Sequence, residues 1–498
     1  MITKQIKEKE ILIKDKTKVL TYILMTIFFI KGIVYATYIV PPMMGMVSDD
    51  IGHFSYIQYL ALERKLPILN KTTIEEIPLI SSTESKKGIF SDQKLNDYFH
   101  STNKNNWIIQ HPPLYYLLLT PFYLITTYFT KSLAKTLVIL RIITVLFGVL
   151  TIYIIYKILQ DLKTNFYVNS CILFSFVFSP AIQYYFSNVT NDSLLIFLCT
   201  LALFFLIHFF TTQNNKSFFF FVISSACVIL TKYTGGLILI GYILLFLAWE
   251  IKNQGLKKTL FLSVQGLIIG IVIIAPYFYH NFLLYGNIFW PENVISPSSK
   301  SVISFMDFFI GSKYFDKIYQ NICLLIGSIN FITANYFVML YNAIIIAFSG
   351  FLFQKEITSK FYKLLIISIS ISSFILSYTF LDLNLSTSIV IGASLSIGLS
   401  LLHQNEINKT LNLGLYISIL IVFLIFLYEH YNIFLDYGYL KALHGRYYYI
   451  IFFPVTYLIF LPIKNIRVKF QRLFSISYLI CQMGYEIWAI NHMILGLL

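Results

Sequence analysis

The sequence has few charged residues. Asp, Glu, Lys and Arg make up 12% of its 498 residues, whereas apolar residues make up 57%. A soluble domain carries about 25% charged and about 45–50% apolar residues. The shortage of charge excludes a water-soluble globular enzyme, and the apolar content excludes a disordered chain. A polytopic membrane protein, with helical spans of ~20 residues each, accounts for this composition.

Cysteine is scarce as well, and no pair has CxxC spacing. The five cysteines lie in or beside apolar runs, at Cys171, Cys199, Cys227, Cys323 and Cys481. They are interpreted as buried apolar side chains rather than as disulfides or metal ligands. The sequence also lacks a Gly-rich nucleotide loop, an HExxH motif and a G-x-S-x-G motif. No cleavable signal peptide is expected, because the apolar run 19–40 is too long for one and lacks a small-residue cleavage site.

The net charge of +14 does not indicate a nucleic-acid partner, because the basic residues form no single patch or motif. Basic residues of a membrane protein collect in short cytoplasmic loops, where they meet anionic lipid heads. Six lysines precede the first apolar run and place the N-terminus in the cytoplasm.

Thirteen apolar runs are predicted to span the membrane. They cover about 19–40, 136–158, 166–186, 192–210, 217–231, 235–250, 259–277, 330–353, 361–380, 386–402, 411–429, 447–463 and 473–497. The chain then divides into a basic cytoplasmic N-terminus (1–18), a first transmembrane module (19–280) with an external loop (41–135), an external loop (281–329) and a C-terminal transmembrane module (330–498).

The apolar segment 114–130 is short and contains Pro121. If it crossed the membrane, most later basic loops would face outward, against the positive-inside rule. We therefore predict that it lies in the outer interface and that the C-terminus is outside. The long polar segments and the turns near Asp192 and Asp382 then face outward.

The first candidate site contains Asp49, Asp50 and His53, a few residues after the first span ends. The spacing of apolar residues predicts an amphipathic helix over 50–62 that lies on the membrane. One aspartate at such a position is commonly a helix N-cap. Two carboxylates with a histidine at the membrane face favour a functional site.

Four further positions on the predicted outer face carry chemistry. His111 precedes a Pro-Pro pair and could cap a helix or donate a hydrogen bond to an anion. Asp192 starts a span and is a candidate cap or a functional carboxylate. Lys232 ends a span, where a lysine either snorkels or serves a site. Arg446 and Tyr447 precede a span, and an arginine there favours phosphate binding over an interfacial anchor.

These motifs together resemble the GT-C fold glycosyltransferases, the relatives of dolichyl-phosphate-mannose protein mannosyltransferases and of the bacterial aminoarabinose transferase of lipid A. The family reads Asp-Glu where this chain has Asp49-Asp50. The matching stretches, in order, are Asp49-Asp50-x-x-His53-Phe54 with Lys65-Leu66-Pro67, His111 to Tyr116, Arg141 to Tyr156, Asn191-Asp192, Thr231 to Gly235 and Gly445-Arg446-Tyr447. The order holds over 19–280, after which only the Gly-Arg-Tyr site matches.

The resemblance implies transfer of a sugar, with inversion, from a polyprenyl-phosphate carrier outside the cytoplasm. It implies that Asp49 is the general base and that Asp192 supports the acceptor side, while the Asp-for-Glu change leaves the role of Asp50 open. The chemistry fits. A glycosyl phosphate carries a good leaving group, so one carboxylate must deprotonate the acceptor. Arg446, with Lys232 and His111, would stabilise the departing phosphate.

Two alternatives remain at this stage. A flippase or polymerase of lipid-linked glycans is one, and a non-catalytic membrane assembly factor is the other. A flippase should place charges inside its spans, whereas here they gather at the outer ends; a polymerase shares the outer placement. Low Gly and Ala with high Ile, Lys and Asn favours a bacterial inner membrane. The sugar, the acceptor (glycan, lipid or protein) and any divalent-metal requirement stay open.

Overall fold

The computed structural model describes residues 2–40, 49–69, 106–289, 304–324, 332–355, 357, 359–379, 381, 383–402, 409–438 and 444–495. Most of the predicted external loops and the turn at Asp382 lie outside the described residues. The described part of the chain consists of helices and their connections, without strands. The predicted all-α polytopic membrane fold is confirmed.

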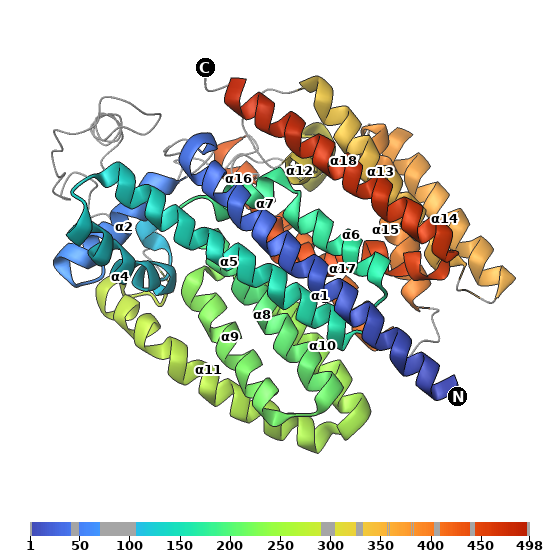
Figure 1. Cartoon of the computed structure of the whole chain (residues 1–498), viewed down its shortest axis with the longest axis horizontal. Helices are drawn as coiled ribbons and strands as arrows, with labels where there is room; N and C mark the ends of the chain where they lie inside the picture. Colours follow the sequence, from blue (N-terminus) through green and yellow to red (C-terminus); the bar gives the residue numbers. More distant parts are fainter. Residues whose placement is uncertain are drawn as a thin grey trace.

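The helices follow one another along the chain with short connections (Figure 1). They are α1 (Ile2–Val34), η1 (Tyr35–Ile39), α2 (Asp50–Glu63), η3 (Trp107–Gln110), α4 (Leu114–Phe129), α5 (Leu133–Asp161), α6 (Phe166–Val177), α7 (Pro180–Phe186), α8 (Asn191–Thr212), α9 (Asn215–Thr231), η4 (Tyr233–Gly235), α10 (Gly236–Gln254), α11 (Leu256–Tyr285), η5 (Asp307–Gly311), α12 (Tyr314–Leu324), α13 (Ile332–Gln354), α14 (Lys360–Thr379), α15 (Leu385–Leu402), α16 (Lys409–Tyr437), η6 (Gly445–Ile451), α17 (Phe452–Phe460), η7 (Leu461–Asn465) and α18 (Val468–Leu495).

Ten helical segments of the described chain are long and apolar enough to cross a membrane, or eleven if the bent pair α6–α7 is one span. Two shorter apolar helices, α9 and the described part of α13, coincide with further predicted spans. The count of thirteen spans stays a prediction. Helix α4, over the segment predicted to lie in the outer interface, is also short and contains Pro121.

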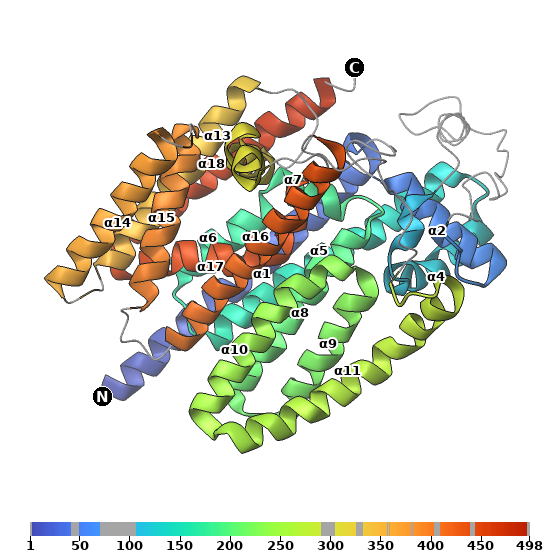
Figure 2. The same cartoon turned by 180° about the vertical axis from the view of Figure 1, so that it is seen from behind.

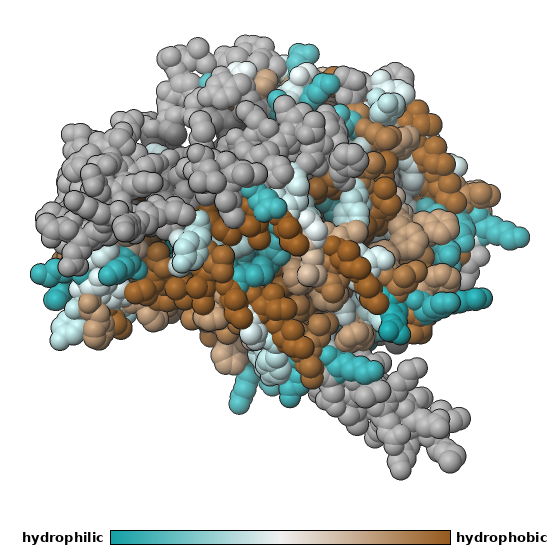
Figure 3. Space-filling view, turned by 45° about the horizontal axis from the view of Figure 1, so that its top comes forward, coloured by the Kyte–Doolittle hydropathy of each residue, from teal (hydrophilic) through white to brown (hydrophobic). Residues whose placement is uncertain are grey.

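The helices form one bundle with two flanks (Figures 1 and 2). Helices α1, α5, α6 and α8 pack in its centre. Helices α9, α10 and α11 lie on one flank, and α13, α14 and α15 pack together on the other. Apolar side chains cover much of the surface of the described helices, as expected where lipid surrounds them (Figure 3).

Small residues allow close packing where α10 meets α16. A Cβ atom on Gly241 would lie 2.6 Å from the Cα atom of Ser418, and one on Gly414 would lie 2.4 Å from a methyl carbon of Leu245. Larger side chains would therefore push these two helices apart. Small residues at helix contacts are typical of membrane bundles, where packing rather than hydrophobicity drives association.

The span α6–α7 is broken by 57° before Pro180. Lys31 of α1 donates a 2.7 Å hydrogen bond to the carbonyl of Val177, at the end of α6, and pairs with Glu486 of α18. A cation at a helix C-terminus satisfies carbonyls left without partners by the break. The break matters because α7 leads directly into the turn before Asp192.

Helix α2 is present with nearly the predicted bounds. It packs on α4 at one end of the bundle (Figure 1). Eleven of its fourteen residues are buried, however, including His53, Ser55 and Gln58. The expectation of a helix with one face open was therefore wrong in this respect. α2 is enclosed by its neighbours and forms part of the wall of the site described below.

Candidate active site

Residues from five distant segments line one cavity of about 170 Å³. Seven of the eight predicted site residues are among them: Asp49, His53, His111, Asp192, Lys232, Arg446 and Tyr447. The cavity is also lined by Trp107, Ile108, Gln110 and His444. The eighth predicted residue, Asp50, does not line it. Helix ends hold the charged residues, which explains why polar groups can gather at the margin of an apolar bundle.

Asp49 occupies the N-cap position of α2, but its side chain makes no capping hydrogen bond. Instead, its Oδ2 atom accepts a 2.8 Å hydrogen bond from Nη2 of Arg446. Both side chains are 9% exposed. A helix cap therefore does not explain this aspartate, whose carboxylate is directed at a cation across the cavity.

Asp192 lies in the first turn of α8, where Thr190 is the N-cap residue. Its Oδ1 atom accepts a 2.6 Å hydrogen bond from Nζ of Lys232. Its Oδ2 atom lies 3.7 Å from Nε of Arg446. Four charged residues thus alternate in sign, in the order Asp49, Arg446, Asp192, Lys232. We call this arrangement the charge chain.

The two cations of the charge chain are buried, at 5% exposure for Lys232 and 9% for Arg446. Both lie over the ring of Tyr447, with Nζ of Lys232 at 5.1 Å and the guanidinium carbon of Arg446 at 5.6 Å from its centroid. Cations placed over an aromatic face are stabilised by its quadrupole. A snorkelling lysine or an interfacial arginine would extend away from the protein, so neither explanation fits these two side chains.

Three histidines face the charge chain. Nδ1 of His53 is 2.9 Å from the hydroxyl of Tyr116, and its ring stacks against that of His111 at 6.1 Å. Burial, with nearby cations, lowers the pKa of His53 well below its usual value. The same causes lower the pKa of His111 to about 3 and that of His444 to about 4. These histidines are therefore neutral at pH 7 and offer hydrogen bonds rather than charge.

Asp50 lies in a separate buried cluster behind the cavity. It pairs with Arg141 of α5, and neither side chain is exposed. Its other oxygen accepts a 2.7 Å hydrogen bond from the amide of Val189. Arg141 also donates to the carbonyls of Ala36 and Val40, at 3.1 and 2.7 Å. We call this the Arg141 cluster. It ties the end of the first span, the start of α2 and the turn before Asp192 to one guanidinium.

Sequence reasoning missed Arg141, Gln110 and Trp107. Arg141 lay in the matched stretch Arg141 to Tyr156 but was not proposed as a site residue. An arginine inside a predicted span is itself a signal, because an ionisable residue at that depth needs a partner. Gln110 and Trp107 carry no such signal. They reach the cavity only because η3 folds against α2.

The described residues contain no group of three or more His, Cys, Asp or Glu side chains arranged to hold a metal ion. Within the cavity, the two carboxylates face cations instead. The chemistry that the described side chains offer is therefore proton transfer by a carboxylate and stabilisation of an anion by Lys232 and Arg446.

Residues 110–280 match the family of dolichyl-phosphate-mannose-protein mannosyltransferases. This range includes His111, Asp192 and Lys232 of the cavity. No curated protein matches in sequence. The match confirms the predicted resemblance to GT-C glycosyltransferases and the enzyme class that it implies.

Two solved structures are similar over most of the chain. The crystal structure of ArnT from Cupriavidus metallidurans bound to undecaprenyl phosphate is 13% identical, and the similarity covers 89% of this chain and 76% of that one, with a TM-score of 0.39. The structure of the same protein in the apo state is 13% identical with the same coverage and a TM-score of 0.37.

Proposed function

We propose that this protein transfers a sugar from a polyprenyl-phosphate donor to an acceptor hydroxyl, with inversion, on the extracytoplasmic side of the membrane. The observation that carries the proposal is the charge chain, in which two carboxylates and two cations from residues 49 to 446 meet in one cavity. The donor class is taken from the matched family, whose name specifies a polyprenyl-phosphate sugar.

In the proposed reaction, Asp49 removes the proton of the acceptor hydroxyl. The acceptor oxygen attacks the anomeric carbon and forms the new glycosidic bond. The bond from that carbon to the phosphate oxygen breaks, and its electron pair leaves with the polyprenyl phosphate. A single displacement inverts the configuration. No strong general acid is needed, because the leaving phosphate is stable as an anion.

The cations of the charge chain suit the leaving phosphate. A sugar phosphodiester has one negative charge, and the phosphate that departs gains another. Arg446 can present two parallel donors to phosphate oxygens, and Lys232 adds a point charge. Their placement in a buried cavity strengthens this stabilisation relative to water. His111, being neutral, can add a hydrogen bond without changing the charge balance.

Asp192 is the better candidate for a supporting carboxylate than for the base. It is 2% exposed and faces both Lys232 and Arg446, whereas Asp49 is 7% exposed and pairs with Arg446 alone. A carboxylate facing two cations is a weak base. We assign Asp192 to orienting Lys232 and the acceptor side, and Asp49 to proton removal.

The outward placement of the site rests on the positive-inside rule. The basic loops between the spans predict which side is cytoplasmic, and the cavity residues then belong to helix ends on the opposite side. A cavity at that margin can receive a donor that moves within the outer leaflet. A flippase would instead need charges along a path through the spans, which disfavours it here.

Glycolipid and glycan profiles of cells with and without the gene would identify the product. Purified protein should then release polyprenyl phosphate from a polyprenyl-phosphate sugar, together with a glycosylated acceptor. The anomeric configuration of the product should be opposite to that of the donor. Retention of configuration, or unchanged profiles with no turnover of any polyprenyl-phosphate sugar, would contradict the proposal.

A further inference from the structure

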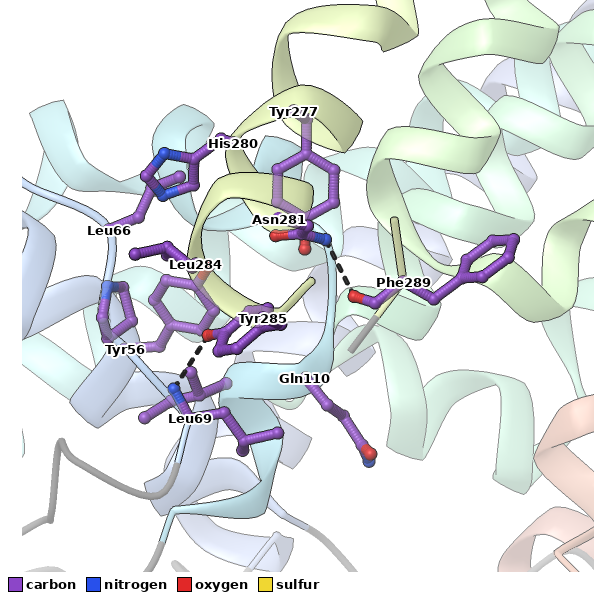
Figure 4. Close-up of a pocket in the computed structure, with 12 residues that line it drawn as sticks. Tyr56, Leu66, Leu69, Gln110, Tyr277, His280, Asn281, Leu284, Tyr285 and Phe289 are labelled. Atoms are coloured by element: carbon purple, nitrogen blue, oxygen red, sulfur yellow. Dashed lines mark hydrogen bonds between the residues drawn. The ribbon is translucent and has the colours of Figure 1, made fainter. Parts of the chain in front are cut away.

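A second pocket adjoins the catalytic cavity (Figure 4). It lies between α2, the segment after α2, η3 and the C-terminal half of α11. Gln110 lines both the pocket and the cavity. The depression measures about 320 Å³ including its open mouth, of which about 10 Å³ is enclosed. We call it the neutral pocket.

The lining residues of the neutral pocket include no Asp, Glu, Lys or Arg, in contrast to the catalytic cavity. Half of them are uncharged but able to form hydrogen bonds: Tyr56, Gln110, Tyr277, His280, Asn281 and Tyr285. The others are apolar. A buried charge without a partner is costly, so the pocket disfavours an ionised ligand. It suits a ligand that combines hydroxyl groups with apolar faces.

The walls of the pocket are held in place from both sides. The hydroxyl of Tyr285 accepts a 3.0 Å hydrogen bond from the amide of Leu69, which joins α11 to the segment after α2. On the opposite wall, the ring of Tyr56 stacks on Tyr116 at 3.8 Å, and Tyr116 contacts His53 of the cavity. An aromatic wall therefore separates the pocket from the cavity.

His280 provides the most specific observation. Its Nε2 atom is buried and has no hydrogen-bond partner within the described part of the chain. Figure 4 shows its ring above Tyr56, beside Leu66. A buried polar atom without a partner destabilises a fold, and such atoms call for an explanation. A hydroxyl group of a ligand in the pocket would supply the missing partner.

We propose that the neutral pocket binds an uncharged sugar residue of the acceptor, which makes the acceptor a neutral glycan. This inference rests on the proposed function, since only a transferase needs an acceptor. A sugar ring stacks on tyrosine and bonds to amide, phenol and imidazole groups. An isoprenoid chain would leave these six polar groups desolvated without partners. Because Gln110 lines both spaces, the bound sugar lies against the cavity that contains Asp49.

The pocket can be tested without the natural acceptor. The full-length protein, in phosphatidylcholine nanodiscs free of sugar detergents, is titrated with maltotriose, and binding is followed by saturation-transfer NMR. Trigalacturonate serves as the charged counterpart. The informative variant is His280→Phe, which keeps an aromatic ring but removes the unpaired nitrogen. Tyr279→Phe is the matched control, because Tyr279 is 64% exposed on the same helix.

Maltotriose should bind the wild type and Tyr279→Phe equally, whereas trigalacturonate should not bind. His280→Phe should weaken maltotriose binding by about tenfold, the factor for one hydrogen bond. Its thermal stability should be unchanged or higher, since no protein contact is lost. A purely structural histidine would change stability and leave binding alone. Absence of maltotriose binding, binding unaffected by His280→Phe, or displacement of maltotriose by farnesol would overturn the sugar site.

Failure of the proposed function would look different. Arg446→Ala should lose turnover of polyprenyl-phosphate sugars while it still binds maltotriose. If the wild type transfers sugar but does not bind maltotriose in this pocket, the neutral-glycan inference is wrong and the proposed function stands. If maltotriose binds but no polyprenyl-phosphate sugar is ever turned over, the proposed function fails and the assignment of the pocket to an acceptor fails with it.

Discussion

Asp49 and Asp50 are adjacent in sequence and offer a matched test of the site. Asp49 faces the cavity and Arg446, whereas Asp50 is fully buried against Arg141. Replacement of each by Asn removes one charge and keeps the shape of the side chain. We expect Asp49→Asn to lose transfer with little loss of stability, and Asp50→Asn to lose stability first.

The magnitudes follow from the surroundings of each carboxylate. Asp50→Asn leaves the guanidinium of Arg141, which is 0% exposed, without its counter-charge. Breaking one partner of a buried pair costs about 3–5 kcal/mol. Asp49→Asn is milder for the fold, because Arg446 still has Asp192 at 3.7 Å and borders the cavity. Its cost falls on the reaction, since a general base contributes ~10²–10⁴-fold.

The assay combines thermal denaturation of the purified variants with transfer from a polyprenyl-phosphate sugar. The double variant Asp50→Leu/Arg141→Leu serves as a control, because replacing both members of a buried pair by apolar residues is often close to neutral for stability. It should recover much of the stability that Asp50→Asn loses. If Asp49→Asn kept near wild-type turnover, or Asp50→Asn kept wild-type stability, the division of roles argued here would be wrong.

Three further predictions concern the donor, the topology and pH. Arg446→Ala should weaken donor use by about 2–4 kcal/mol, the scale for losing a stabiliser of developing charge, while Arg446→Lys should have a modest effect; unchanged donor kinetics in Arg446→Ala would leave this arginine a structural role only. In a Cys-free background, cysteines at Ser85 and Leu440 should label from outside, and those at Gln254 and Ile466 only after permeabilisation. Outside labelling at Gln254 would mean that 114–130 crosses the membrane. Because the pKa of His111 falls to about 3 and that of His444 to about 4, the unfolded chain binds more protons below its histidine pKa of about 6.5. Melting temperatures should therefore fall as pH drops from about 6.5 toward 4, and His111→Gln and His444→Gln should reduce this acid sensitivity.

The sequence located most of the candidate site because its members lie at helix ends, where polar residues stand out against apolar runs. Asp49, Asp192, Lys232 and Arg446 could each be recognised in this way. Their pairing could not. Asp49 and Arg446 are 397 positions apart, and no local pattern relates them. The contacts depend on how the helices pack, which the apolar period of a membrane span does not determine.

The Arg141 cluster shows a second limit. Asp50 appeared equivalent to Asp49, since both precede the same helix. Their side chains diverge because successive residues at a helix start point about 100° apart, so one reaches the cavity and the other reaches α5. Only the structure distinguishes them. Likewise, the neutral pocket combines residues of α2, η3 and α11 that carry no charge and no motif, so sequence reasoning had no signal for it.

The charge chain relates donor binding to the readiness of the base. In the structure, Arg446 holds the carboxylate of Asp49 at 2.8 Å, and a carboxylate so paired is a poor proton acceptor. A donor phosphate in the cavity would compete for the same guanidinium, because phosphate binds it in the same bidentate manner. In the proposed reaction, Asp49 therefore becomes an effective base only once the donor has drawn Arg446 away. Since Arg446 also lies near Asp192, it remains compensated as it moves. The order that follows, with the donor bound before the acceptor is deprotonated, would protect the enzyme from unproductive proton transfer.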